Sequence, residues 1–153
     1  MEVGIIFGNK ILDVVFIAWF IAQFYKVFSS IIVEKKFNAK RLWETGGMPS
    51  SHSSTVSALA TAIGISQGLT SPLFAISVVF AIIVMHDAAG IRRAAGKQAG
   101  VLNNLRESLS KLFDEKFGEI QLKELLGHSP VEVLAGAILG IAVAFIMKSY
   151  LIG

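Results

Sequence analysis

Residues 46–54 read Gly-Gly-Met-Pro-Ser-Ser-His-Ser-Ser, and a long apolar segment follows them directly. A second polar turn, Gly-His-Ser-Pro-Val-Glu at residues 127–132, opens into another apolar segment in the same way. The start of a helix presents unpaired backbone N–H groups and a partial positive charge, which suit the binding of a phosphate. Two histidines placed at two such helix starts indicate a phosphoryl-transfer site at the edge of a membrane.

The composition places the chain among membrane proteins. Of its 153 residues, 54% are hydrophobic and 16% are charged, whereas a soluble domain is about 45–50% apolar and about 25% charged. The length fits one domain, which we expect to cover residues 1–153. The absence of cysteine excludes a disulfide, a thiolate nucleophile and a Cys-ligated zinc ion.

Four segments approach the roughly 20 apolar residues that a bilayer-spanning helix needs. They cover residues 11–33, 53–69, 72–90 and 130–151, and they predict an all-α bundle in the membrane. The second is short and rich in Ala, Ser, Thr and Gly, so we expect it inside the bundle rather than facing lipid. The first lacks a preceding basic region and a clear cleavage site, which favours a retained helix over a signal peptide.

Two further features of the segments concern packing. Gly136 and Gly140 form a flat stripe on the fourth segment, which fits close contact with another helix and a homodimer, although glycine is also common in membrane helices without such a role. Residues 97–126 carry leucines at helical spacing with charged residues between them. They predict an amphipathic cytoplasmic helical insert that lies on the membrane surface or caps the bundle, or else a simple packed connector.

The basic residues are distributed unevenly along the chain. Of the 14, 11 fall in the two loops that follow the first and third segments, while Lys10 and Lys148 lie near the termini. The positive-inside rule then places both loops in the cytoplasm and both termini outside. With four spans, this multi-pass topology puts the two histidine turns on the same cytoplasmic side of the membrane.

The first turn has the residue types of an anion site. Ser50 or Ser51 caps the following helix, and the backbone N–H groups at its start point toward a bound anion. His52 adds a group that titrates near neutral pH. An ordinary N-cap beside a surface histidine has the same sequence pattern.

The second turn pairs a histidine with a carboxylate. His128 and Glu132 are four residues apart, hence on one face if the helix begins there. A carboxylate on one ring nitrogen fixes the tautomer and leaves the other nitrogen free, as a nucleophile attacking phosphorus requires. Alternatively, Glu132 compensates the helix dipole and His128 is a polar turn residue.

Charged residues at the ends of the first and third segments complete the candidate site. Arg92 or Arg93 matches phosphate oxygens with a forked set of donors, or binds lipid headgroups instead. Asp87 is expected to orient a neighbour by pairing with one of these arginines, with Lys26 or with Arg41. Lys26 is a phosphate-binding candidate if it turns inward, and otherwise extends to the membrane interface.

In their order along the chain, these motifs resemble a known superfamily. Pro-Ser-Ser-His at residues 49–52 is similar to the Pro-Ser-Gly-His signature of type 2 phosphatidic acid phosphatases and vanadium haloperoxidases. The segment His-Ser-Pro-Val-Glu at residues 128–132 is similar to their His-x-x-x-Asp signature. The chain resembles the divergent bacterial and plant branch of that superfamily more closely. This resemblance rests on three motifs in order: Gly-Gly-Met-Pro-Ser-Ser-His, Asp-x-x-Gly-Ile-Arg-Arg and Gly-His-Ser-Pro-x-Glu-Val. The resemblance covers residues 26–140.

The resemblance implies a membrane phosphatase that hydrolyses a lipid phosphate or pyrophosphate through a phosphohistidine, without metal or cofactor. By the same resemblance His128 is the nucleophile, Glu132 orients it, and His52 protonates the leaving oxygen. The family's arginine six residues before the nucleophile is Leu122 here, so an arginine at 92 or 93 replaces it. The implied phosphate-binding residues are Ser50, Ser51, Arg92, Arg93, Arg41 and Lys26.

Two other classes of function fit parts of the pattern. A non-catalytic lipid-phosphate binder or scaffold would use the same basic and hydroxyl groups. A metal site would use the ligand types that zinc accepts, although their spacing is not a known zinc pattern, from the set His52, His86, Asp87, His128 and Glu132. We expect no metal and no nucleic-acid partner, with the bilayer and a lipid phosphate as the binding partners.

Overall fold

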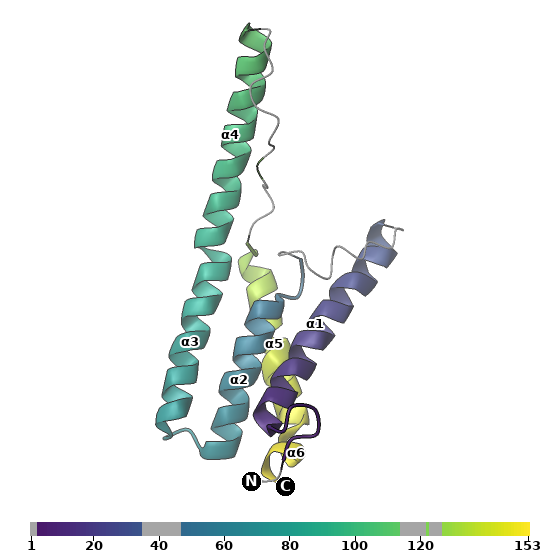
Figure 1. Cartoon of the computed structure of the whole chain (residues 1–153), viewed down its shortest axis with the longest axis vertical. Coiled ribbons are helices and arrows are strands. Elements are labelled where there is room, and N and C mark those ends of the chain that lie inside the picture. The colour runs from purple at the N-terminus through teal and green to yellow at the C-terminus, as the bar shows by residue number, and fades with distance from the viewer. Residues whose placement is uncertain (1–2, 35–46, 114–121, 123–126) are drawn as a thin grey trace.

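The computed structural model describes residues 3–34, 47–113, 122 and 127–153. In that part of the chain every regular element is a helix, so the all-α prediction is confirmed (Figure 1). The helices are α1 (Lys10–Glu34), α2 (Ser51–Gln67), α3 (Pro72–Ala89), α4 (Ile91–Phe113), α5 (Pro130–Ile146) and the short α6 (Lys148–Ile152).

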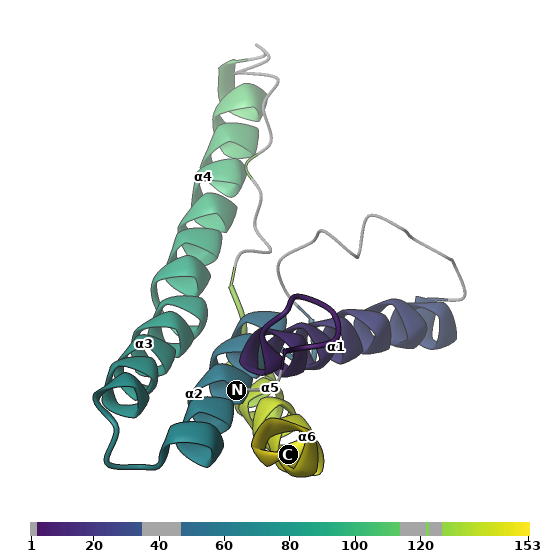
Figure 2. The same ribbon diagram turned by 60° about the horizontal axis from the view of Figure 1, so that its bottom comes forward.

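Helix α2 occupies the centre of the bundle, as its small side chains predict. It packs against α1, α3 and α5, and the views in Figures 1 and 2 agree on this arrangement. Its buried positions are alanine, serine and valine residues, which let the neighbouring backbones approach closely. The hydroxyl of Ser54, for example, donates a hydrogen bond to the Ala18 carbonyl oxygen of α1 at 3.1 Å.

Helix α5 approaches α2 closely at two glycines. A Cβ added at Gly136 would lie 2.3 Å from the Ser50 carbonyl oxygen, and one at Gly140 would lie 2.2 Å from the Ser54 carbonyl oxygen. The glycine stripe is therefore used inside the chain and gives no support to a homodimer through that face. The homodimer itself stays a prediction.

The outer surface of the bundle is apolar. Helices α1 and α3 expose large hydrophobic side chains, among them Phe20, Phe24, Ile76, Val79 and Ile82. Two helical stretches, Lys10–Phe28 and Pro72–Phe113, are long and apolar enough to cross a membrane, and Pro130–Ile146 is apolar but shorter. These features agree with a helical membrane protein, and the count of four spans stays a prediction.

The two histidine turns lie at one end of the bundle, and the termini lie at the other (Figure 1). At the terminal end, the buried carboxylate of Asp13 accepts hydrogen bonds from the Tyr150 hydroxyl and from the backbone N–H groups of Ile6 and Phe7. This contact fastens the N-terminal residues to α6. The shared end of the two turns is the arrangement that a single site requires.

The amphipathic helix differs from the expectation in its start and its direction. Helix α4 begins at Ile91 rather than near residue 97, and it continues the direction of α3 past the bundle instead of capping it (Figures 1 and 2). The reason lies at Gly90, where the hydrogen-bond ladder is kept: Gly90 N–H donates to His86 and Ala94 N–H donates to Gly90. Residues 114–126 of the expected insert, apart from Leu122, lie outside the described residues.

Candidate active site

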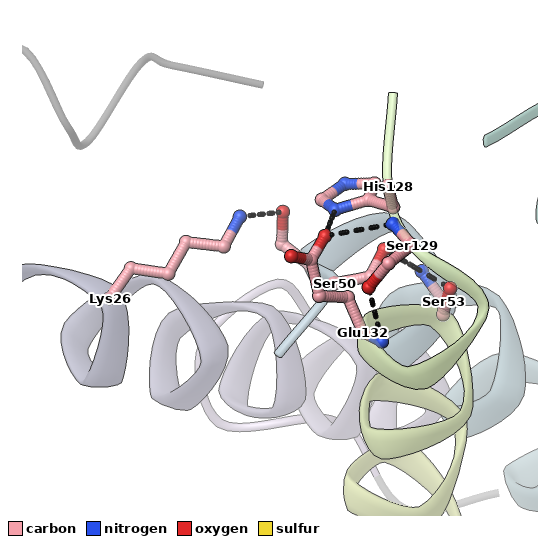
Figure 3. A network of polar contacts seen from close by, with 7 residues as sticks. Lys26, Ser50, Ser53, His128, Ser129 and Glu132 are labelled. Carbon is pink, nitrogen blue, oxygen red and sulfur yellow. Dashed lines mark hydrogen bonds and ion pairs between the residues drawn. The ribbon is translucent and has the colours of Figure 1, made fainter. Parts of the chain in front are cut away.

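Ser50 forms the N-cap of α2 and links the two polar turns. Its side-chain oxygen accepts from the Ser53 backbone N–H at 3.3 Å and from the Ser53 hydroxyl at 3.1 Å (Figure 3). Its own backbone N–H donates to the Glu132 carbonyl oxygen at 3.0 Å. Because the Ser50 side chain is fully buried in the cap, its hydroxyl is not among the groups that line the cavity described below.

The second turn is held by a capping box. The Ser129 side chain accepts from the Glu132 backbone N–H at 3.3 Å, and a Glu132 carboxylate oxygen accepts from the Ser129 backbone N–H at 3.1 Å. The backbone N–H of His128 donates to the Ala88 carbonyl oxygen at 2.9 Å, which fixes the turn to the end of α3. Gly127 has φ +85°, and a Cβ there would lie 2.5 Å from the Arg93 backbone nitrogen.

His128 has one ring nitrogen engaged and the other open. Its Nδ1 lies 3.1 Å from Glu132 Oε2, as the four-residue spacing predicted. Its Nε2 is buried and has no hydrogen-bond partner within the described residues. With Nδ1–H donating to the carboxylate, the Nε2 atom carries an available lone pair.

Burial lowers the pKa of His128 below its ordinary value, while the hydrogen bond that its ring donates to the Glu132 carboxylate and a contact with the Gly47 backbone oppose that shift. The ring is 3% exposed, so the loss of hydration outweighs the carboxylate. His128 is therefore neutral at neutral pH, the form in which Nε2 acts as a nucleophile. The ring of His52 lies beside it, edge to face, with 6.0 Å between the ring centroids.

A cavity of about 290 Å³ opens beside the two histidines. This volume is near the lower end of small-molecule pockets and fits a phosphoryl group better than a whole lipid. Arg92 lies on the cavity wall, where its Nε donates to Asp87 Oδ2 at 2.7 Å. The cavity is lined by His52, Ile83, Val84, Asp87, Ala88, Arg92, Gly127 and His128.

Lys26 approaches the same end of the bundle from α1. Its side chain is buried, and its Nζ donates to the Ser51 hydroxyl at 3.2 Å (Figure 3). The lysine thus turns inward instead of extending to the membrane interface. A cation and a hydroxyl stand next to the histidine pair from this side, and Arg92 stands next to it from the side of α3.

The structure therefore brings most of the predicted site residues together at one end of the bundle. Arg93 is exposed and does not line the cavity, and Arg41 lies outside the described residues. Within the described ranges, no group of three His, Asp or Glu side chains could hold a metal ion.

Sequence reasoning missed three features of the site. The capping box has a readable signal, because Ser129 precedes Glu132 by three residues. The cavity wall made by Ile83 and Val84 has no such signal, since any apolar residue of α3 has the same character in the sequence. The packing of Gly127 against the start of α4 likewise depends on the tertiary arrangement.

Comparison with known proteins identifies the family. The family described as "Divergent PAP2 family" matches residues 7–143, a range that includes both histidine turns. The chain is also 42% identical over 138 residues to "Uncharacterized membrane protein YuiD" of Bacillus subtilis (strain 168), a match that covers 84% of this chain and 87% of that protein. No solved structure matches. The resemblance of the motifs is thus confirmed, and the chain belongs to the Divergent PAP2 family of membrane proteins.

Proposed function

We propose that this protein is a membrane phosphatase that hydrolyses a lipid phosphate or pyrophosphate through a phosphohistidine on His128. The observation that best supports this proposal is the buried, unpartnered Nε2 of His128, with Glu132 on the opposite ring nitrogen. A histidine with a structural role alone would have no reason to keep that atom open beside a cavity and a second histidine.

In the first step, Nε2 of His128 attacks the phosphorus atom and the bond from phosphorus to the leaving oxygen breaks. His52 delivers a proton to that oxygen, which leaves as an alcohol or as the shorter phosphate. A bound phosphate is negatively charged and favours the protonated form of a neighbouring imidazole, so His52 is charged when the proton is needed. Glu132 stabilises the positive charge that develops on His128.

In the second step, a water molecule attacks the phosphohistidine. His52, now neutral, removes a proton from this water, and the bond from Nε2 to phosphorus breaks to release inorganic phosphate. The histidine pair returns to its starting protonation state. The two rings, 6.0 Å apart between centroids, are close enough to act on one phosphoryl group.

The phosphoryl oxygens would be held from both sides of the histidines. Arg92 keeps its terminal nitrogens for the phosphate, since Nε is used by Asp87. Ser51 and Lys26 supply a hydroxyl and an ammonium group from the side of α1. The apolar wall of Ile83 and Val84 continues onto the exposed apolar surface of α3, which favours a substrate with a lipid tail.

The test is phosphate release by the purified protein in detergent with EDTA, using phosphatidate and a polyprenyl pyrophosphate. We expect turnover on one of them and its loss in His128→Ala. The matched control is His86→Ala, because His86 is exposed on α3 and does not line the cavity. Rapid quenching should trap phosphate on the wild-type protein and not on His128→Ala.

Two results would contradict the proposal. One is undiminished turnover in His128→Ala, because the reaction would then run without the nucleophile. The other is saturable binding of the lipid phosphates with no turnover and no phosphoenzyme, which would identify a non-catalytic binder instead.

A further inference from the structure

Helix α4 carries a heptad repeat that the candidate site does not use. Its positions alternate between steps of four and three residues, and they are Ile91, Ala95, Gln98, Leu102, Leu105, Leu109 and Leu112. Six of these are exposed and Leu109 is half-buried. We call this row the α4 stripe. Apolar residues at this period form the contact surface of helices that wind around one another.

The rest of the chain that the structure describes leaves the α4 stripe uncovered. Among the described helices, α4 contacts only α3, at its first turns. The buried residues of α4 lie on another side, where the Asn103 amide exchanges two hydrogen bonds with the Leu122 backbone at 2.8 and 3.0 Å. Leu122 thus contacts a different side of α4 from the stripe.

The direction of α4 argues against the bilayer as its cover. The helix extends α3 beyond the bundle (Figures 1 and 2), so a membrane around the bundle would leave the α4 stripe in water. Lying flat on the membrane would require a bend at Gly90, where the backbone hydrogen bonds are continuous.

We infer that α4 pairs with α4 of a second copy of this chain as a parallel two-stranded coiled coil. Two copies with the same topology in one bilayer point α4 in the same direction, so identical stripe positions face each other. Gln98 would then meet Gln98, and a single polar pair of this kind fixes the register of such helices.

The residues beside the α4 stripe are compatible with that pairing. On one edge they are Ala94, Val101 and Ser108, and none of these is charged. In a parallel pair, each of these uncharged residues faces a residue on the other edge of the partner's stripe. A basic residue on that other edge, such as Arg106, therefore faces no second positive charge. None of the α4 stripe residues lines the cavity at the two histidines, so the pairing does not depend on the catalytic proposal.

The chain contains no cysteine, so single cysteines report the contact cleanly. The full-length variants Leu102→Cys and Leu105→Cys, reconstituted in proteoliposomes, should form disulfide-linked dimers under mild oxidation. The matched control is Asn104→Cys, which is exposed on the opposite side of the same helix turn and should stay monomeric. Adding Leu109→Glu to Leu102→Cys should reduce its cross-linking at least tenfold.

The proposal is overturned if neither stripe cysteine forms a dimer, or if Asn104→Cys forms dimers equally well. It is also overturned if a fluorophore at position 105 is quenched by a lipid-attached quencher, because the α4 stripe would then lie in the bilayer. All three positions that receive a cysteine are exposed, so loss of folding does not obscure the cross-linking result.

Discussion

At the residue scale, the candidate nucleophile and its helix cap share one carboxylate. Glu132 Oε2 lies within hydrogen-bond distance of both His128 Nδ1 and the Ser129 backbone nitrogen. The same group therefore completes the start of α5 and fixes the tautomer of the histidine. This geometry is compatible with both interpretations of Glu132 that the sequence leaves open, as a dipole partner and as an orienting residue.

The variant Glu132→Gln is expected to lower turnover by roughly 10²–10⁴-fold and to move the acid limb of the pH–rate profile. His128 must be neutral to attack, so activity is lost as pH falls through its pKa, which burial places below the ordinary value. Glu132 raises that pKa, so its removal moves the limb to lower pH. A profile of kcat against pH measures this shift, and a limb that moves upward would contradict it.

The two neighbouring arginines should differ in their effect on substrate binding. Arg92 lines the cavity and Arg93 does not, although both follow Asp87 closely in the sequence. Arg92→Ala removes charge-assisted hydrogen bonds of about 1.5–3 kcal/mol in total and should raise KM by roughly 10–150-fold. Arg93→Ala is the matched control and should stay within about twofold. Equal losses in the two variants would show that the cavity is not the phosphate site.

At the element scale, the contact between α2 and α5 sets the separation of the two histidine turns. Gly140→Ala places a methyl group against the Ser54 carbonyl oxygen, where only 2.2 Å is available. The two helices must move apart, which lowers the free energy of unfolding by about 1–3 kcal/mol. Because this movement also displaces the histidine turns, turnover should fall. Thermal unfolding in detergent measures the loss. Ile138→Ala, on the exposed side of α5, is the control and should change stability less.

The starts of the helices could be predicted from the sequence, and their partners could not. Ser71-Pro72 and Ser129-Pro130 are local signals, because a serine cap and a proline at the first helical position act within one turn. The use of Gly136 and Gly140 inside the chain is different, since a small-residue stripe looks the same whichever helix meets it. The direction of α4 likewise depends on whether Gly90 breaks or continues the hydrogen-bond ladder.

At the scale of the whole molecule, the two ends of the bundle have opposite characters. One end holds the histidine turns and the start of α4, and the other holds the termini and the turn between α2 and α3 (Figure 1). The predicted site could be assembled from the sequence because α1, α2, α3 and α5 alternate in direction, which brings both turns to one end (Figure 1). Which end faces the cytoplasm rests on the basic residues.

Single cysteines in this cysteine-free chain can test that orientation directly. Thr70→Cys lies in the exposed turn between α2 and α3, and Lys97→Cys lies on exposed α4. A membrane-impermeant maleimide added to intact cells should label the cysteine at 70 at once and the cysteine at 97 only after permeabilisation. The physical reason is that translocating Lys- and Arg-rich loops is unfavourable, so the end that carries Arg92, Arg93 and Lys97 stays inside. The reverse labelling pattern would place the histidine site outside the cell, where it would meet a different pool of phosphates. Labelling of both positions in intact cells would show that the chain inserts in two orientations.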